Sequence, residues 1–234
     1  MSQTVRRVVV TGAAGRIGRA ITSLLPSSWQ LALTDLAAGA GVAPLDITDA
    51  QACLAAFQGA DAVVHLAAEP APDASWEQLL PANVIGAYEV AYAAAHCGVR
   101  RLVLASSLHA VSAVSETTQV RPDDPPRPGN LYGATKAWAE ALGAWVAATT
   151  STTVVALRIG YFSTRKPVPG EVPLRDWTAW LSDRDAAELV RAAVESEGFD
   201  FVVANGTSAN RFRRADLQQT VRRLGYHPVD DAWA

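Results

Sequence analysis

Short apolar runs alternate with longer amphipathic segments along the whole chain of 234 residues. The apolar runs have the length of strands and cover residues 7–11, 31–34, 62–66, 102–106, 153–159 and 201–204. The segments between them have helical spacing and cover residues 16–25, 50–57, 76–96, 131–148, 183–195 and 215–224. Runs such as Val8-Val9-Val10 are apolar at every position, which is typical of a parallel sheet covered by helices on both faces. The alternation predicts a doubly wound, Rossmann-type α/β fold.

The predicted elements follow one another without a repeat or a clear linker. A chain of this length suits one domain with a sizeable core, so we expect residues 1–234 to form a single domain. Two proline-rich stretches, 121–129 and 167–173, interrupt the pattern. Such stretches are either plain surface connections or loops that lie over an active site.

Composition narrows the classes of partner. Half of the residues are hydrophobic, 18% are charged and the net charge is −3, without a basic run, so we expect no nucleic-acid partner. No apolar stretch approaches the roughly 20 residues of a membrane helix, and the N-terminal apolar run is too short for a signal peptide. Cys53 and Cys97 lie in alanine-rich helical patterns, which favours a reducing, cytoplasmic compartment. We expect no metal site.

Three glycines follow the first predicted strand and precede the first predicted helix. Gly12, Gly15 and Gly18 form the pattern G-x-x-G-x-x-G. A diphosphate needs backbone amides at close range, and a side chain at Gly12 or Gly15 would block its approach. Gly18 would let the helix pack close to the sheet, and the helix that begins near Arg16 would direct its positive end toward the phosphates. This context favours a dinucleotide site over a plain glycine-rich loop.

Asp35 ends the second predicted strand, 23 residues after Gly12. A carboxylate at this place would accept hydrogen bonds from the adenosine ribose hydroxyls and would repel a 2′-phosphate. Neither Thr34 nor Leu36 offers a compensating cation. We therefore predict NAD rather than NADP as the cofactor, although a plain turn aspartate is the alternative.

Two further places are predicted beside the cofactor. Asp46 and Ile47 follow a short third strand, where the adenine ring would rest, and small residues end the strand at 62–66, where they leave room. The residues expected to contact the cofactor from this reasoning are Gly12, Gly15, Arg16, Ile17, Asp35, Asp46, Ile47, Leu66, Ala67 and Ala68.

Tyr132 and Lys136 are four residues apart on a predicted helix, so they share one face. The pKa of a free tyrosine is about 10, and a nearby ammonium group lowers it. The pair would then accept a proton from a substrate hydroxyl while a nicotinamide accepts a hydride. Ser106 and Ser107 end a strand 25 to 26 residues upstream of Tyr132, where a serine hydroxyl would hold the reacting oxygen. A simple strand-end turn is the alternative for the serines.

In combination these residues resemble the extended type of short-chain dehydrogenase/reductase, the NAD-dependent epimerase/dehydratase family. The matching motifs are Thr11-Gly-Ala-Ala-Gly-Arg-Ile-Gly18, His65-Leu-Ala-Ala68, Asn83-Val-Ile-Gly86, Ala105-Ser-Ser107, Tyr132-Gly-Ala-Thr-Lys136 and Leu157-Arg-Ile-Gly160. The resemblance implies that Tyr132 is the base, that Lys136 is its electrostatic partner and that Ser107 holds the reacting oxygen. It also implies that Asn83 orders the core near Lys136 and that Asn83, Tyr132 and Lys136 contribute to the cofactor site.

Within that family the chain is most similar to the uronate dehydrogenases, which oxidise the anomeric carbon of glucuronate or galacturonate with NAD. The similar segments are Ser107-Leu108-His109, Pro125-Pro-Arg-Pro128 before Leu131-Tyr-Gly, and Leu174-Arg-Asp-Trp-Thr-Ala-Trp-Leu-Ser182. This similarity implies that His109 and Arg175 contact the substrate, since a guanidinium can bind both oxygens of a carboxylate. A packed strand-end histidine and a solvated surface arginine are the alternatives.

The chain departs from that branch at several positions. Leu108 replaces an asparagine, Tyr161 replaces a serine, and Glu69 and Pro70 replace small or polar groups. A carboxylate at Glu69 would repel an acidic substrate unless a cation such as Arg175 intervenes. The expected substrate is therefore a uronic acid, a modified sugar acid or a more apolar hydroxy compound. The residues expected to contact it are Glu69, Ser107, Leu108, His109, Tyr161 and Arg175, with a small C-terminal lobe formed within about 161–182 and 205–234.

Two other functions remain open. A nucleotide-sugar epimerase or dehydratase would use the same pair and recycle its NAD, but only 98 residues follow Lys136, and such enzymes usually carry a larger C-terminal lobe. A sensor that binds NAD without chemistry would not need Ser107, Tyr132 and Lys136. The arginines at 211, 213 and 214 are interpreted as the solvated start of the last helix rather than as anion-steering groups. The oligomeric state stays open, a homo-oligomer included.

Overall fold

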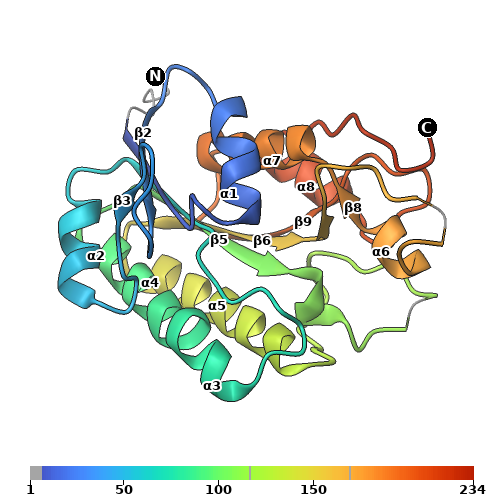
Figure 1. Ribbon diagram of the computed structural model, residues 1–234, viewed down its shortest axis with the longest axis horizontal. Coiled ribbons are helices and arrows are strands. Elements are labelled where there is room, and N and C mark those ends of the chain that lie inside the picture. The colour runs from blue at the N-terminus through green and yellow to red at the C-terminus, as the bar shows by residue number, and fades with distance from the viewer. Residues whose placement is uncertain (1–6, 116, 169) are drawn as a thin grey trace.

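A computed structural model describes residues 7–115, 117–168 and 170–234. Its centre is a parallel sheet of seven strands in the order β3-β2-β1-β4-β5-β6-β9 (Figure 1). The strands are β1 (Arg7–Thr11), β2 (Gln30–Asp35), β3 (Ala43–Pro44), β4 (Ala62–His65), β5 (Arg101–Ser107), β6 (Thr153–Ile159) and β9 (Phe201–Gly206). The chain passes outward from β1 to β3 and then crosses to β4 on the other side of β1, so the winding direction reverses between β1 and β4. The predicted doubly wound, Rossmann-type sheet is confirmed.

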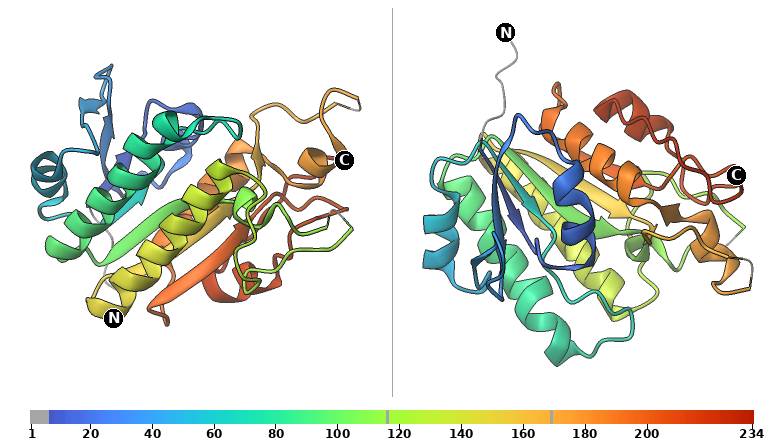
Figure 2. Two further views of the ribbon diagram at one scale, coloured as in Figure 1. Left: turned by 90° about the horizontal axis from the view of Figure 1, so that it is seen from below. Right: turned by 45° about the horizontal axis from the view of Figure 1, so that its top comes forward.

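Helices cover both faces of this sheet (Figures 1 and 2). One face carries α2 (Ala50–Phe57), α4 (Ala87–His96) and α5 (Leu131–Thr149), and the other carries α1 (Arg16–Ile21), α7 (Asp183–Glu195) and α8 (Gln218–Leu224). The shorter elements are the 3-10 turns η1 (Thr22–Leu24) and η3 (Leu108–Val111), the helices α3 (Trp76–Leu79) and α6 (Leu174–Thr178), and the π-helical turn η2 (Leu80–Gly86). Because successive side chains of a strand point to opposite faces, Val8 and Val10 pack toward α1 and α7 whereas Val9 packs toward α2 and α4. This explains why the strands are apolar at every position.

A buried ion pair joins α5 to the sheet. The guanidinium of Arg158 on β6 donates from Nε to Oε1 of Glu140 at 2.8 Å and from Nη2 to Oε2 at 2.9 Å. Ser106 donates to the same carboxylate at 2.7 Å, and Arg158 also donates to the backbone carbonyls of Arg121 and Asp124. The proline-rich stretch after η3 is therefore tied to the sheet and to the helix that carries Tyr132.

Several elements differ from the prediction. The helix expected over 16–25 ends at Ile21 and is followed by the 3-10 turn η1, and four strands differ by one or two residues at their ends. The expected helix over 76–96 consists of α3, the π-helical turn η2 and α4, because a polar side chain at Asn83 is buried in its middle and Pro81 lacks a backbone N–H. A second parallel sheet, β7 (Tyr161–Phe162) with β8 (Trp180–Leu181), is too short to show a period in the sequence. The last helix begins at Gln218, three residues later than predicted.

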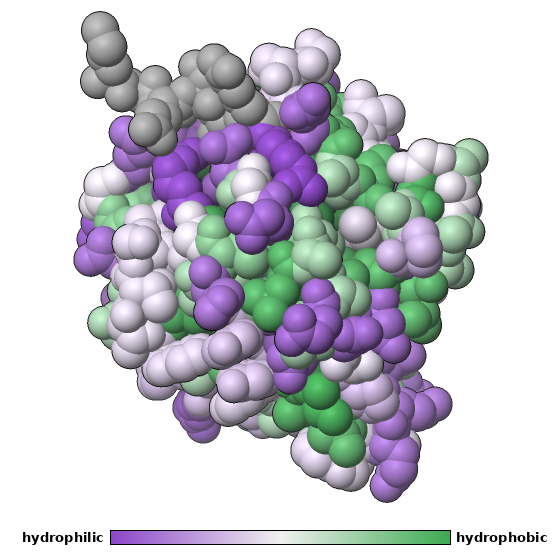
Figure 3. Space-filling model, turned by 90° about the vertical axis from the view of Figure 1, so that its left-hand side faces the viewer, coloured by the Kyte–Doolittle hydropathy of each residue, from purple (hydrophilic) through white to green (hydrophobic). Residues whose placement is uncertain are grey.

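Across residues 7–115, 117–168 and 170–234, no helix has both the length and the apolar character needed to cross a membrane. Hydrophilic and hydrophobic residues are interspersed on the face of the molecule that carries β3 and α2 (Figure 3).

Candidate active site

A cavity of about 630 Å³ lies at the carboxyl ends of β1, β4, β5 and β6, where the winding direction reverses. Its volume is in the range of small-molecule and cofactor sites. The structure brings the following predicted site residues together in its wall: Gly12, Gly15, Arg16, Ile17, Leu66, Ala68, Ser107, Leu108, His109, Tyr132, Lys136, Tyr161 and Arg175.

The glycine turn forms one end of the cavity. Gly12 has a φ of +75°, a conformation that favours glycine, and a Cβ at this position would lie 2.4 Å from the backbone nitrogen of Ala67. A Cβ at Gly18 would lie 2.4 Å from the carbonyl oxygen of Gly12. Glycine is thus required at position 12 first because the end of β1 approaches the end of β4 closely. Clearance for a diphosphate is a secondary requirement. Gly15 is exposed in the cavity wall, as the prediction of clearance requires.

Asp35 lies at the carboxyl end of β2 beside this turn. Its carboxylate accepts hydrogen bonds from the backbone nitrogens of Ala14 at 2.9 Å and Leu36 at 2.8 Å. Each carboxylate oxygen can accept a further hydrogen bond. Asp35 thus lies against the glycine turn but outside the cavity wall itself, and its contact with a ribose remains a prediction.

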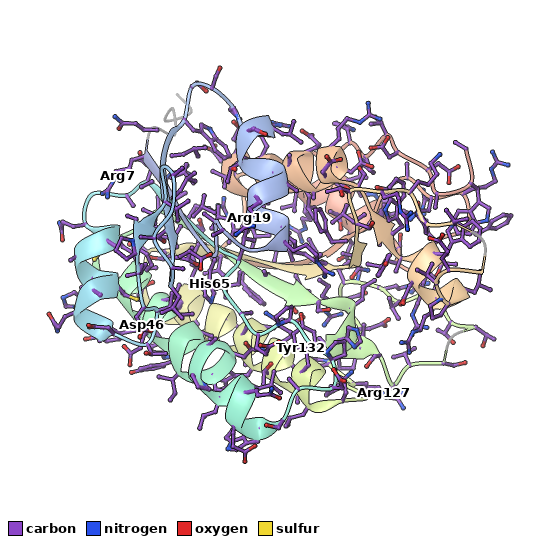
Figure 4. All side chains as sticks on the ribbon, in the orientation of Figure 1. Arg7, Arg19, Asp46, His65, Arg127 and Tyr132 are labelled. Atoms are coloured by element: carbon purple, nitrogen blue, oxygen red, sulfur yellow. The ribbon has the colours of Figure 1, made fainter. Side chains whose placement is uncertain are left out.

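Asp46 and Ile47 are not brought into the cavity. The Asp46 carboxylate accepts hydrogen bonds from the nitrogen and the hydroxyl of Thr48, and these bonds lower its pKa. Ile47 is buried in the core, where its side chain lies against Gly86. In Figure 4, Asp46 lies beside α2, on the side of the molecule away from Tyr132. Asp46 therefore stabilises the turn before α2, and Ile47 packs against the start of α4.

Asn83 fixes the loop after β4, although it lies outside the cavity wall. Its Oδ1 accepts from the nitrogen of Glu69 at 2.8 Å, and its Nδ2 donates to the carbonyl of Glu69 at 3.0 Å and to Oγ1 of Thr135 at 3.1 Å. Thr135 precedes Lys136 on α5, so Asn83 ties the loop after β4 to the helix that carries Lys136. The Glu69 carboxylate accepts from the nitrogen of Ala71 at 3.0 Å and is directed to its own loop.

Tyr132, Lys136 and Ser107 meet in the cavity wall. The Lys136 ammonium donates to the carbonyl of Ala105 at 3.0 Å and lies 5.5 Å from the centre of the Tyr132 ring. Tyr132 and Lys136 are both less than a tenth exposed. Burial lowers the pKa of Lys136 to about 8, because the charged ammonium loses its hydration.

In the chain alone, the pKa of Tyr132 is raised rather than lowered. Burial raises the pKa of the Tyr132 phenol above its ordinary value, and the charge of Glu69 raises it further. A hydrogen bond with Ser107 and the positive charge of Arg16 act in the opposite direction, yet they do not offset the loss of hydration. Arg16, in the glycine turn, is therefore a further cation that favours the phenolate, and the Y-x-x-x-K motif gives no signal for it.

His109 is held in one orientation at the start of η3. Asn130 caps α5 by accepting at Oδ1 from the nitrogen of Gly133 at 2.8 Å, and its Nδ2 lies 3.0 Å from Nδ1 of His109. An amide NH2 can only donate, so Nδ1 is the acceptor and the neutral ring carries its proton on Nε2. Burial, and after it the charge of Arg175, lowers the pKa of His109 and keeps the ring neutral. The ring meets Tyr132 edge to face at 5.5 Å.

Arg175 and Tyr161 enter the cavity from the segment after β6. A Cβ at Gly160 would lie 2.1 Å from the carbonyl of Ala179, so this glycine lets β7 and α6 come together. The Arg175 side chain is about half exposed, at 55%, and its Nε lies 3.4 Å from Asp176, which also lines the cavity. Arg175 is therefore both a cavity residue and a partner of a neighbouring carboxylate.

Several residues of the site were missed. Ala71, Pro72, Asp176 and Arg214 line the cavity, while Asn130 and Gly133 position His109. The interpretation of Arg214 as part of a solvated helix start is wrong, because α8 begins at Gln218 and Arg214 lies in the irregular segment before it. Nothing local in the sequence indicates this placement, since it arises from contacts with distant segments.

A dinucleotide fits the residues that are present. Gly15 lies exposed in the cavity wall, the first turn of α1 has no side-chain cap, and Asp35 stands at the adjacent strand end.

Comparison with known proteins agrees with the family resemblance found in the sequence. The profile of the NAD dependent epimerase/dehydratase family matches residues 8–183. The chain is 36% identical to L-arabinose 1-dehydrogenase (NAD(P)(+)) from Haloferax volcanii over 97% of each chain. It is 34% identical to NAD-dependent glucose-6-phosphate dehydrogenase from the same organism, over 96% of this chain and 94% of the relative.

Among solved structures, a mutant of uronate dehydrogenase from Agrobacterium tumefaciens complexed with NAD is 31% identical. It superposes with a TM-score of 0.87 over 98% of this chain and 87% of that chain. The family profile covers most of the chain, and the relatives match it over nearly its full length. The chain belongs to the NAD dependent epimerase/dehydratase family.

Proposed function

We propose that the chain is an NAD-dependent dehydrogenase that oxidises the anomeric hydroxyl of a sugar or sugar acid. The observation that carries this proposal is the convergence of Ser107, Tyr132 and Lys136 in one cavity with the glycine turn. The relatives named above are sugar dehydrogenases, which favours net oxidation over the recycling of NAD by an epimerase.

In the proposed reaction, the Ser107 hydroxyl donates to the substrate oxygen, and the Tyr132 phenolate accepts the proton of the substrate hydroxyl and becomes the phenol. Lys136 is anchored to the carbonyl of Ala105, and its ammonium stabilises the Tyr132 phenolate before the proton is transferred. His109 offers its Nε2–H as a hydrogen-bond donor to the sugar. NAD, when bound, supplies the hydride acceptor.

The cofactor is proposed to lie along the glycine turn and the end of β4. Gly12, Gly15, Arg16 and Ile17 surround the diphosphate, and Asp35 accepts from the ribose hydroxyls and disfavours NADP. Residues 66–68, which follow β4, border the nicotinamide half of the cofactor. The adenine contact predicted for Asp46 and Ile47 remains a prediction.

The substrate is proposed to lie against the segments 161–182 and 205–234. Tyr161 narrows the space, and Arg175 provides a cation for a carboxylate or a phosphoryl group. Leu108 faces the same cavity with an apolar side chain, so it provides contact rather than a hydrogen bond. We propose an acidic sugar as the preferred substrate.

The test is a spectroscopic assay of the purified chain with NAD and four sugars: glucuronate, galacturonate, glucose 6-phosphate and L-arabinose. We expect net formation of NADH with at least one of them, and its loss in Tyr132→Phe. Tightly held NAD without net reduction would instead support an epimerase. NAD binding without turnover, unchanged by Tyr132→Phe, would support a sensor.

A further inference from the structure

Arg214 lines the same cavity as Tyr132 and Arg175 and is held there by three segments of the chain. Its backbone nitrogen donates to the carbonyl of Thr178 at 3.4 Å, and its carbonyl accepts from the nitrogen of Val120 at 2.8 Å. Its side-chain Nη2 donates to the carbonyl of Val114 at 2.9 Å. The residue is half-buried, unlike its neighbour Arg213, which is exposed.

The two cavity arginines differ in their charge partners. Arg175 lies 3.4 Å from the carboxylate of Asp176 and shares its charge with it. Within the described part of the chain, Arg214 forms no ion pair, and its single side-chain hydrogen bond is to a neutral carbonyl. A guanidinium has five N–H donors, so Arg214 retains donors for a ligand. A half-buried cation without a carboxylate beside it is stabilised by an anion in the cavity.

The two arginines belong to adjoining stretches of backbone. Thr178, which accepts from the Arg214 nitrogen, also donates from its hydroxyl to the carbonyl of Arg175 at 2.9 Å. The chain thus brings the segment before α8 against the end of α6. An anion in this part of the cavity meets Arg175, Arg214 and one carboxylate, Asp176, which leaves an excess of one positive charge.

Resting on the proposed function, we propose that Arg214 binds the anionic group of the substrate and selects acidic sugars over neutral ones. The group is a carboxylate or a phosphoryl group, because both present planar pairs of oxygens to a guanidinium. A carboxylate is satisfied by one bidentate guanidinium, whereas a phosphoryl group carries more charge and a third oxygen and engages both arginines.

The test compares Arg214→Gln with the matched control Arg213→Gln, an exposed arginine one residue away that does not line the cavity. We expect Arg214→Gln to lower kcat/KM for the acidic sugar about 10- to 100-fold, mainly through KM, since a hydrogen bond to a charged group is lost. The ratio of kcat/KM for the acidic sugar to that for L-arabinose falls at least about tenfold. Arg213→Gln leaves this ratio unchanged, and Arg214→Lys restores part of it.

The assay is run separately with galacturonate and with glucose 6-phosphate. The sugar whose kcat/KM falls more in Arg214→Gln identifies the anionic group that Arg214 binds. An equal loss for acidic and neutral sugars, or no loss for either acid, overturns the proposal. If the wild-type chain reduces no NAD with any sugar, the proposed function fails. Calorimetric binding of galacturonate and glucose 6-phosphate to wild type and Arg214→Gln then still tests Arg214, because equal affinities would contradict its role.

Discussion

At the glycine turn, the wall of the cavity is mostly backbone, whereas near Arg175 it is made of charged and aromatic side chains. The proposed cofactor side depends on close approaches, such as that of Gly12 to Ala67, between the ends of strands that are neighbours in the sheet. The substrate side joins His109, Arg175 and Arg214, which come from η3, α6 and the segment before α8.

The difference explains why the two sides carry different information in the sequence. A backbone site restricts residue type at fixed spacing, because only glycine fits a positive φ or a contact of 2.4 Å. A side-chain site is assembled by the whole fold, and each of its members has an ordinary local environment. Specificity can therefore change on the substrate side while the cofactor side stays the same.

The largest expected effect separates chemistry from binding. Tyr132→Phe removes the group that accepts the proton, and we expect kcat/KM to fall by about 10³-fold or more. The dissociation constant of NAD, measured by fluorescence titration, changes by less than about threefold, because the backbone of the glycine turn is untouched. A comparable loss of NAD affinity would show that the two sides are not independent.

The second prediction tests the buried ion pair between Glu140 and Arg158, which ties α5 and the stretch after η3 to the sheet. Glu140→Gln leaves the buried Arg158 without its carboxylate, and we expect the free energy of unfolding to fall by about 3–5 kcal/mol. The control is Glu171→Gln, which breaks an exposed pair with Arg165 and costs less than about 1 kcal/mol. Urea denaturation of both variants measures the difference, and equal costs would contradict a structural role for the buried pair.

The third effect tests the backbone character of the cofactor side. Gly12→Ala introduces a Cβ 2.4 Å from Ala67 at a positive φ, and we expect a loss of about 3 kcal/mol together with weaker NAD binding. Gly41→Ala is the matched control, because Gly41 has a φ of +74° and open space around its Cβ, and it costs about 1 kcal/mol. If both variants unfold at the same urea concentration, the close approach to Ala67 is not what requires glycine.

The effect with the smallest change per step is the pH dependence of two histidines, His65 at the end of β4 and His109 in the cavity wall. Burial, and then the charge of Lys136, lowers the pKa of His65 to about 3, while its Nδ1 lies 2.8 Å from the Thr11 hydroxyl. Below pH 6.5 the unfolded chain binds a proton at His65 and the folded chain does not until about pH 3. The free energy of unfolding therefore falls as the pH decreases through this window, by up to about 1.4 kcal/mol per pH unit.

Denaturation curves at several pH values measure this slope in wild type, His65→Gln and His109→Gln. The pKa of His109 is lowered as well, so it contributes a slope of the same sign that also begins at pH 6.5. We expect His65→Gln to remove the larger share. An unchanged slope in His65→Gln would show that its buried ring is protonated in the folded chain.

The sequence predicted the parts of the fold that have a local period. The bounds of β1, α2, β6 and α7 match the expected ranges, because each combines an apolar pattern with a clear start or end. The sheet of β7 and β8 was missed, since two residues show no alternation. The π-helical turn was missed because its cause is the burial of Asn83, a contact with a distant loop.

The same reasoning applies to the candidate site. Motif residues such as Gly15, Ser107 and Tyr132 line the cavity as expected. The raised pKa of Tyr132 could not be predicted, because it depends on how much water the folded chain removes. The place of Arg214 depends on a bridge between Val120 and Ala215, which lie far apart in the chain.

The π-helical turn has a consequence for how the chain can change length. The Ala87 nitrogen donates to the carbonyl of Ala82, five residues back, so the helix holds one residue more here than an α-helical turn would. Each residue rotates an α-helix by about 100° around its axis. The extra residue therefore determines the direction in which Asn83 points relative to the buried face of α4. Deleting a single residue within Leu80–Gly86 would restore a regular helix and turn one of these two faces away from its partners. The number of residues between Asn83 and α4 is thus fixed by the contacts that both ends make.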